Sequence, residues 1–334
     1  MVVIGRKERS RVMEIDFTNC KVNPSYLYGG SNGKKIGIEY NGEMYMLKFP
    51  NKIDKKDGEY SNSIFSEHIA CQIFKSMGFE VQDTLLGSYT LDNGICKDVV
   101  ACKDFTVGGY VLKEFAELKN SVITTSNSGY GTDLEEVLET IKEQTLVDSN
   151  ALMEYFWCLF IGDALLGNFD RHNGNWGFLI KRGVDEVKFA PIYDCCSCLY
   201  PQLDDKMMEI YLQDENELEK RTYIFPNSAL KLGGNKINYY EFINSLTNKD
   251  CNKALLKVYP RIDIKRIDDI IDRTANISSI RKEFYKTIVK KRYECILTPA
   301  YKKLLEKQGE QFIKNGLFLY EISSLCYNLN NEAR

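Results

Sequence analysis

The chain has 334 residues, of which 44% are hydrophobic and 27% are charged, and its net charge at pH 7 is −3. This length fits two domains or one domain with two lobes, and the weak charge excludes a general affinity for polyanions. Eleven cysteines without a recognisable secretory segment indicate free thiols in a reducing compartment.

The first informative stretch is a glycine-rich loop, which comprises Gly29, Gly30, Ser31, Asn32 and Gly33. It precedes two predicted strands, residues 35–40 and 43–49, which the turn-forming pair Asn41-Gly42 joins. The glycine spacing and the strand that follows do not fit a Walker A loop, which opens a helix. Between antiparallel strands, such a loop can cover phosphate groups with its N–H groups, and a mobile surface turn is the alternative.

Lys48 interrupts the second of these apolar strands. Its position fits either a solvent-facing edge or a phosphate-contacting lysine, which would need a carboxylate partner on a following helix. Residues 62–77 predict that helix, because Phe65, Ile69, Ile73 and Met77 recur at a spacing of four. Glu67 in its first turns is the candidate partner, and we interpret His68 as a packed core histidine.

Two further strands are predicted at residues 84–90 and 97–105, and the second would pass between two lobes. A polar loop follows at 121–132, and then a short helix at 134–144. Residues 150–166 are almost continuously apolar and predict a helix that is buried on most sides, with Gly167 as its stop.

The stretch from Gly167 to Asn175 carries the strongest functional signal. Asp170 and Asn175 lie five positions apart, like the proton-accepting Asp and the metal-binding Asn of the protein-kinase catalytic loop. Arg171 and His172 follow the Asp here, whereas their counterparts precede it in that loop. Apolar segments at 176–180 and 187–192 then predict a hairpin that returns Asp194 toward Asn175. Asp, Asn and Asp in this order supply oxygen ligands suited to Mg²⁺.

The rest of the chain is less specific. The sequence Cys195-Cys196-Ser197-Cys198 has no second Cys or His pair at zinc spacing, so packed free thiols are expected. Residues 278–305 predict a helix with Ile280, Phe284 and Ile288 facing inward. We expect its basic side chains to lie mostly outside, on a solvated face, with a nucleic-acid-binding patch as the alternative; these are Arg281, Lys282, Lys286, Lys290, Lys291 and Arg292.

Together these motifs resemble the bacterial HipA-like serine/threonine kinases, most closely their shorter CtkA-like branch. The matching stretches are 29–33, 45–50, 66–68, 100–105, 165–179 and 190–194. The resemblance implies an α+β, two-lobed protein-kinase-like fold. Residues 1–105 would form an N-lobe with an antiparallel sheet, one helix and the hinge, and residues 106–334 a mostly helical C-lobe.

The resemblance also implies ATP and Mg²⁺ as cofactors and phosphorylation of Ser/Thr hydroxyls on a protein, including the enzyme itself. Asp170 would be the catalytic base, and Asn175 and Asp194 would hold the metal. The ATP-binding residues would be Gly29, Gly30, Ser31, Asn32, Gly33, Lys48, Glu67, Cys102, Lys103, Asp104, Phe105 and His172. Ser31 is the candidate autophosphorylation switch, because phosphate there would repel the phosphates of ATP.

Two other functions stay open. The Asp-Arg-His order also resembles phosphoinositide kinases, which would make the acceptor a lipid. A nucleotide-binding pseudokinase that acts through a partner or nucleic acid is the third alternative. An acidic segment, residues 195–221, is expected to border the acceptor site and to favour neutral or basic peptides over anionic headgroups. We therefore expect no membrane or nucleic-acid partner, and a cytoplasmic location, with delivery outside the producing cell without a cleaved signal peptide as the alternative.

Overall fold

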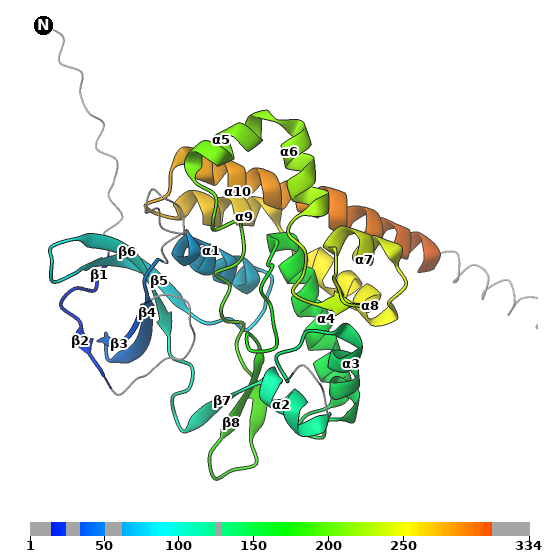
Figure 1. Cartoon of the computed structure of the whole chain (residues 1–334), viewed down its shortest axis with the longest axis horizontal. Coiled ribbons are helices and arrows are strands. Elements are labelled where there is room, and N and C mark those ends of the chain that lie inside the picture. The colour runs from blue at the N-terminus through cyan, green and yellow to red at the C-terminus, as the bar shows by residue number, and fades with distance from the viewer. Residues whose placement is uncertain (1–14, 25–33, 51–61, 124–127, 309–334) are drawn as a thin grey trace, which may run out of the picture.

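The structure is a computed structural model, and it describes residues 15–24, 34–50, 62–123 and 128–308. The chain forms an α+β fold in which a curled sheet lies to one side and a larger, mostly helical part lies to the other (Figure 1). The glycine-rich loop, residues 29–33, lies outside the described residues.

The N-terminal sheet has six described strands in the order β1-β5-β6-β4-β3-β2. All neighbours in it pair antiparallel except β1 and β5, which are parallel at the edge. Asn41 and Gly42 both have positive φ, 53° and 77°, as a two-residue hairpin turn of type I′ requires. The strands are β1 Ile15–Asp16, β2 Lys21–Val22, β3 Lys35–Tyr40, β4 Glu43–Lys48, β5 Thr84–Thr90 and β6 Cys96–Lys103.

Helix α1, Ser63–Ser76, joins this sheet to the helical part of the molecule. Its residue Phe74 packs against Gly162 of the helix α4, Ser149–Leu166. A Cβ at Gly162 would lie 2.2 Å from Cε1 of Phe74, so only glycine permits this close approach. The helix that supplies Glu67 is thereby fixed against the helix that precedes the loop containing Asp170.

Helix α4 is the central element of the larger part (Figure 1), and twelve of its residues are buried. The continuous apolar run predicted this helix to within one residue at its start. It ends where Gly167 adopts the left-handed conformation, φ 65°, and its N–H bonds the carbonyl of Asp163. The chain can therefore turn sharply into the loop that holds Asp170.

A three-stranded antiparallel sheet packs beside this loop, in the order β7-β8-β9. The predicted hairpin is confirmed as β8, Gly177–Lys181, and β9, Val187–Phe189. Strand β7, Tyr110–Glu114, is a third strand that sequence patterning did not indicate. Its last residue lies opposite Gly177 and brings Glu114 to the edge of the cleft described below.

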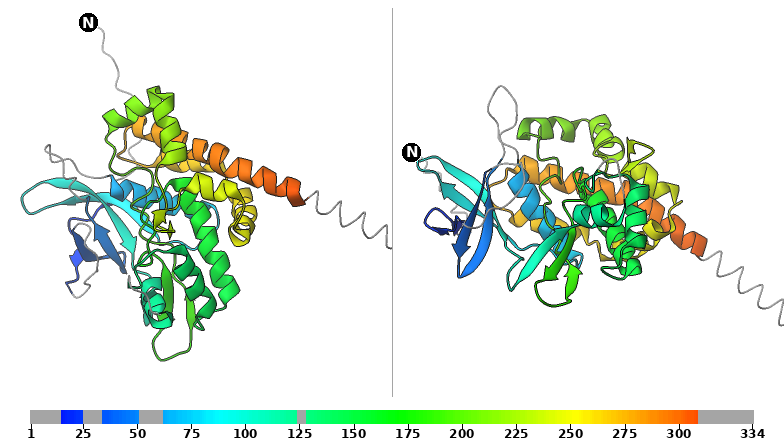
Figure 2. Two further views of the ribbon diagram at one scale, coloured as in Figure 1. Left: turned by 45° about the vertical axis from the view of Figure 1, so that its right-hand side comes forward. Right: turned by 60° about the horizontal axis from the view of Figure 1, so that its bottom comes forward.

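The remaining helices complete the larger part of the molecule, which two rotated views show beside the curled sheet (Figure 2). They are α2 Phe115–Val122, α3 Leu134–Glu143, α5 Asp205–Gln213, α6 Glu215–Glu219, α7 Tyr239–Ser245, α8 Lys249–Val258, α9 Ile264–Arg273 and α10 Ser279–Arg292. The shorter elements are π-helical turns at Lys220–Ile224 and Tyr293–Leu297, a 3₁₀ turn at Tyr259–Arg261, and a hairpin of β10 Lys231–Leu232 and β11 Asn235–Lys236. None of the helices in the described ranges is long and apolar enough to span a bilayer.

Helix α10 corrects one expectation about its basic residues. Phe284 and Ile288 are buried as predicted, but so are Arg281 and Arg292. The Arg292 guanidinium donates to the carbonyl of Ala164 at 2.7 Å, which caps the end of α4. Arg281 pairs with Asp205 at 2.5 Å. Periodicity placed both arginines on a solvated face because it contains no information about which other elements cover a helix.

Candidate active site

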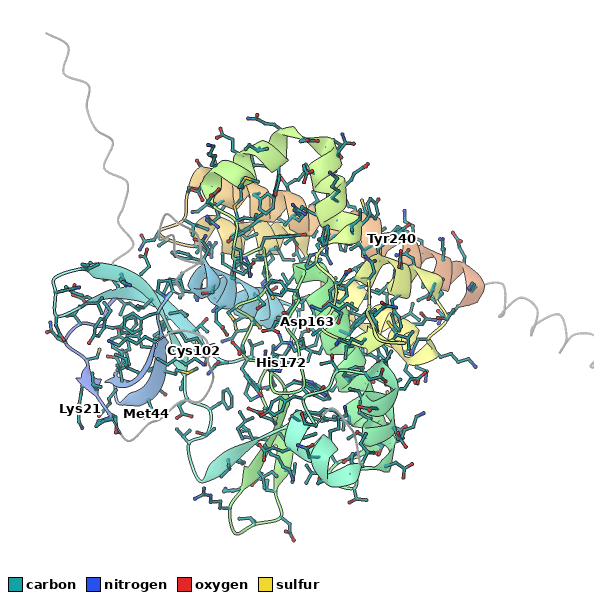
Figure 3. The ribbon with its side chains drawn as sticks, in the orientation of Figure 1. Lys21, Met44, Cys102, Asp163, His172 and Tyr240 are labelled. Atoms are coloured by element: carbon teal, nitrogen blue, oxygen red, sulfur yellow. The ribbon has the colours of Figure 1, made fainter. Side chains whose placement is uncertain are left out.

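A cleft of about 660 Å³ separates the six-stranded sheet from the helical part. Cys102 lies on the sheet side and His172 and Asp163 on the helical side (Figure 3). The cleft wall combines polar residues from both sides with apolar ones. It includes Lys35, Met46, Lys48, Gln82, Val100, Asp104, Phe105, Thr106, Leu112, Glu114, Tyr130, Asp170, His172, Gly174, Asn175, Tyr193 and Asp194.

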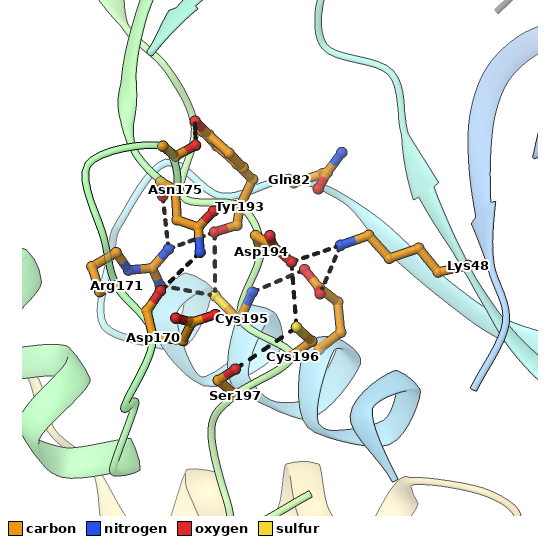
Figure 4. Close-up of polar contacts among 12 residues, drawn as sticks. Lys48, Gln82, Asp170, Arg171, Asn175, Tyr193, Asp194, Cys195, Cys196 and Ser197 are labelled. Carbon is orange, nitrogen blue, oxygen red and sulfur yellow. Dashed lines mark hydrogen bonds and ion pairs between the residues drawn. The ribbon is translucent and has the colours of Figure 1, made fainter. Parts of the chain in front are cut away.

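Lys48 on β4 makes two ion pairs in this cleft (Figure 4). Its Nζ lies 2.9 Å from Glu67 Oε2 and 3.1 Å from Asp194 Oδ1. Burial opposes the charged form of Lys48, but the two carboxylates outweigh it and raise the pKa of Lys48 well above its usual value. Glu67 is held in turn, because its Oε1 accepts a hydrogen bond from the Cys195 N–H at 3.1 Å. The lysine is therefore a permanent cation fixed between β4, α1 and the segment that follows Asp194.

Arg171 holds the loop that contains Asp170 in position. Its Nε and Nη2 lie 3.0 and 3.2 Å from the two carboxylate oxygens of Asp163 on α4. Its Nη1 donates to the carbonyls of Asn175, at 2.9 Å, and Tyr193, at 2.5 Å. A single buried guanidinium thus joins α4, the end of the loop and the residue before Asp194. Sequence patterning did not indicate this role, because it showed only that a basic residue follows Asp170.

Asp170 is held by its backbone, which leaves its carboxylate at the cleft wall. Its N–H donates to Asn168 Oδ1 at 3.0 Å, and its carbonyl accepts from Asn175 Nδ2 at 2.8 Å. Asn168 is itself fixed by Tyr239, whose hydroxyl donates to the Asn168 carbonyl at 2.6 Å. Burial raises the pKa of Asp170 above its usual value, which makes this carboxylate a better proton acceptor than an exposed one.

Asn175 and Asp194 present oxygen atoms of the kind that Mg²⁺ prefers. Because the Asn175 amide nitrogen donates to the Asp170 carbonyl, its oxygen is the atom left for a ligand. Lys48 lowers the pKa of Asp194 well below its usual range, so this carboxylate stays ionised. Asp194 also has φ 52°, a left-handed conformation that is costly for a non-glycine residue and is found at functional sites. The donor set fits magnesium.

A second cluster of possible metal ligands, which also includes Asp194, does not fit magnesium. Glu67, Asp194 and Cys196 place one ligand atom each within 4.8 Å of one another. However, Glu67 already pairs with Lys48, and burial raises the pKa of the Cys196 thiol well above its usual value. A protonated thiol is a poor ligand for a hard cation. The described cysteines, including Cys195, Cys196 and Cys198, are free thiols.

The remaining predicted residues divide between the cleft and its surroundings. Asp104 and Phe105 line the cleft, and so does His172, whose Nδ1 accepts from the Gly174 N–H at 3.0 Å. Cys102 is fully buried outside the cleft wall. The Lys103 side chain points away and pairs with Glu43 at 2.5 Å. The glycine-rich residues 29–33 lie outside the described residues.

The cleft also contains residues that sequence reasoning missed. Gln82 and Val100 come from the sheet side, and Glu114, Tyr130 and Tyr193 from the helical side. Tyr130 donates to Glu114 Oε2 at 2.8 Å. Alternation along the strand 97–105 could have indicated Val100, but the position of Gln82 follows only from the packing of its loop against Ile192.

The acidic segment expected beside the acceptor site is not a free negative surface. Helices α5 and α6 carry most of its acids, and α5 packs against both α6 and α10. Asp205 pairs with Arg281, Glu215 with Lys291, and Glu217 with Lys220 and Arg221. Of residues 195–221, only Cys196 lines the cleft. The charge of residues 195–221 therefore does not favour a basic peptide over a lipid headgroup.

The Lys48–Glu67 pair, Asp170, Asn175 and Asp194 lie around one cleft, and this combination of residue types is the one that protein kinases use for phosphoryl transfer. Comparisons with known proteins agree. The sequence profile of the HipA-like C-terminal domain matches residues 28–278. The serine/threonine-protein kinase CtkA of Helicobacter pylori strain J99 is 48% identical over 294 residues, which cover 87% of this chain and 89% of that protein.

Solved structures show the same relationship. The crystal structure of the H. pylori proinflammatory kinase CtkA matches with a TM-score of 0.83 and 48% identity, over 88% of this chain and 98% of that chain. The HipA of Shewanella oneidensis MR-1, solved with HipB and operator DNA, matches with a TM-score of 0.51 over 84% of this chain and 70% of that chain. At 14% identity, this second match shows the fold alone.

The protein therefore has the two-lobed protein-kinase-like fold and is an enzyme of the serine/threonine protein kinase class. It belongs to the HipA-like C-terminal domain family.

Proposed function

We propose that this enzyme transfers the γ-phosphate of ATP, in the presence of Mg²⁺, to Ser/Thr hydroxyls of a protein, itself included. One observation carries the proposal: a buried lysine cation, a base and two oxygen ligands converge on one cleft. Phosphoryl transfer needs little covalent help, so positioning and neutralisation of charge supply most of the rate.

In the proposed reaction, Asp170 is the catalytic base. The acceptor hydroxyl oxygen bonds to the γ-phosphorus, the bond from that phosphorus to the bridging oxygen of ADP breaks, and the hydroxyl proton passes to the Asp170 carboxylate. Its raised pKa suits this acceptance. The backbone N–H of Asp170 donates to Asn168, and its carbonyl accepts from Asn175, so the residue that carries the carboxylate is held in place before the acceptor arrives.

Lys48 would contact the phosphates of ATP, and Glu67 would hold it in position. Asn175 and Asp194 would hold Mg²⁺, which when bound offsets the negative charge of the phosphates. In this scheme residues 1–105 form the lobe that covers the nucleotide, with residues 29–33 over its phosphates. Residues 106–334 form the lobe that carries the base and accepts the protein substrate. Ser31 stays the candidate autophosphorylation switch.

A lipid acceptor is the second candidate, since the acidic segment no longer argues against it. Protein is favoured because the relative that is 48% identical over most of this chain is named a serine/threonine-protein kinase. A pseudokinase is disfavoured because Lys48, Asp170, Asn175 and Asp194, the residues that transfer would need, all line the cleft.

The test uses ATP labelled in its γ-phosphate and three acceptor conditions: no added acceptor, a generic protein substrate, and vesicles that contain phosphoinositide. We expect label on the added protein or on the enzyme, with mass spectrometry locating it on Ser or Thr, and no transfer after chelation of Mg²⁺. Asp194→Asn should weaken ATP binding only when Mg²⁺ is present. Label on the lipid alone would overturn the protein acceptor, and binding without any transfer would favour the pseudokinase.

A further inference from the structure

Gln82 lies in the cleft wall, and the proposed transfer step does not use it. Its side chain is only 6% exposed. Its backbone N–H donates to the carbonyl of Ile192 at 2.9 Å, and its side-chain Nε2 donates to the carbonyl of Lys103 at 2.9 Å. Gln82 is therefore fixed at its backbone to the segment that leads to Asp194 and at its side chain to the end of β6.

The Lys103 carbonyl determines which way the Gln82 amide faces. A carbonyl oxygen only accepts, so the amide nitrogen must point toward it. In the reversed orientation two acceptor oxygens would face each other with no proton between them. The amide oxygen, Oε1, is therefore the atom that Gln82 offers to the cleft. No donor from the described residues lies at hydrogen-bond distance from Oε1.

The neighbouring backbone is already in use. The N–H of Lys103 donates to the Asp83 carbonyl and that of Asp104 to the Met44 carbonyl, both at 2.8 Å. The Lys103 carbonyl accepts from Gln82. At the end of β6, these backbone N–H and carbonyl groups are therefore not available to a ligand. Gln82 Oε1 is a fixed, buried acceptor beside them. Apolar Met46, Val100 and Leu112 supply the other walls.

We propose that Gln82 selects the purine base of the nucleotide substrate. Its Oε1 accepts a hydrogen bond from the exocyclic 6-amino group of adenine and repels the 6-oxo oxygen of guanine or hypoxanthine. The inference rests on the proposed nucleotide function and adds the residue that makes the site prefer adenine. A locked acceptor discriminates because the wrong base leaves two buried oxygens unpaired and facing each other.

The experiment compares ATP with two analogues. Inosine triphosphate replaces the 6-amino group by an oxo group, and purine riboside triphosphate lacks any group there. Both kcat/KM and the dissociation constant are measured for the wild type and for Gln82→Met, which keeps the length of the side chain but has no amide. Gln144→Met is the matched control, since Gln144 is also a buried glutamine, donates to the Val147 carbonyl at 2.8 Å and lies outside the cleft.

The wild type should prefer ATP over both analogues. In Gln82→Met the preference over purine riboside triphosphate should fall by about three- to tenfold, the effect of one neutral hydrogen bond, and the preference over inosine triphosphate by more. Gln144→Met should keep both wild-type ratios. Gln82→Glu, which retains an acceptor but loses the donor to Lys103, should keep the preference for ATP over inosine triphosphate.

Two results would overturn the inference. An equal loss with all three nucleotides in Gln82→Met would mean that Gln82 only braces the strand. Wild-type use of purine riboside triphosphate within twofold of ATP would mean that no group reads the amine, and this result does not depend on whether the variant folds. A wild type that binds nucleotides but transfers no phosphate would instead contradict the proposed function, and the dissociation constants would still decide the role of Gln82.

Discussion

The segment around Asp170, residues 163–198, and the α5–α6 region, residues 204–221, both contain paired charged side chains but use them differently. In the Asp170 segment Asp163 and Arg171 are buried, and their bonds measure 2.5–3.2 Å. In the α5–α6 region Glu215 is largely exposed and pairs with Lys291 of α10, and Glu217 pairs with neighbours in sequence. The buried pairs hold the backbone around Asp170 in one geometry, whereas the exposed pairs lie on the surface of the α5–α6 region.

This difference has a physical cause. A buried charge must be paired and hydrogen-bonded, because losing its partner leaves the full cost of desolvation. An exposed pair competes with water and salt and contributes little. Removing one partner from a buried pair and one from an exposed pair should therefore change the free energy of unfolding by very different amounts.

The largest expected effect is that of Arg171→Met. This change leaves the Asp163 carboxylate buried without its partner, so the free energy of unfolding should fall by about 3–5 kcal/mol. Burial already raises the pKa of Asp163, and loss of the cation should raise it further. A raised carboxyl pKa means that the folded state binds more protons than the unfolded state between the two pKa values, so stability falls as pH rises.

Urea denaturation of Arg171→Met at pH 5.5 and pH 8 measures both effects. The destabilisation relative to wild type should be smaller at the lower pH, where Asp163 can take up a proton. A loss below about 1 kcal/mol at both pH values would place this pair in the same class as a surface pair and contradict the contrast.

The second effect concerns a buried base without an ionic partner. Burial lowers the pKa of His68 to about 4, and its Nδ1 lies 3.0 Å from Thr84 Oγ1. The unfolded chain takes up this proton near a pKa of about 6.5, so the stability due to neutral His68 is present above that value and is lost as pH falls toward 4. The loss should be roughly 3 kcal/mol over that range.

His68→Gln supplies the control, because glutamine can bond Thr84 but does not titrate. The difference between the wild-type and variant free energies of unfolding, followed from pH 7.5 to pH 4, isolates His68 from the carboxylates. A difference that does not change with pH would show that His68 is solvated in the folded protein.

The smallest effect should come from Lys291→Met. Its partner Glu215 is largely exposed, so removal of the pair should change the free energy of unfolding by no more than about 1 kcal/mol. Added salt should reduce even this change. A loss comparable to that of Arg171→Met, unaffected by salt, would remove the distinction between the two regions.

Features that depend on local sequence could be predicted, whereas features that depend on contacts between distant elements could not. Local patterns predicted the helix that ends before Gly167 and the hairpin before Asp194. The five-residue spacing of Asp170 and Asn175, which matches a kinase motif, predicted that these two residues belong to one site. The inward direction of Arg171, the buried Arg281 and Arg292, and the placement of Gln82 depend on elements distant in the sequence. Local periodicity contains no information about such contacts. For the same reason, the expectation that residues 195–221 border the acceptor site as a negative surface was wrong.

The assignment of Asp170 as the catalytic base is tested by measuring phosphate transfer and ATP affinity in Asp170→Asn. The substitution keeps size and the backbone bonds to Asn168 and Asn175 but removes the base. We expect phosphate transfer to fall by about 10²–10⁴-fold, with the dissociation constant for Mg-ATP nearly unchanged. Transfer at the wild-type rate would contradict the assignment of Asp170 as the base and, with it, our account of the cleft.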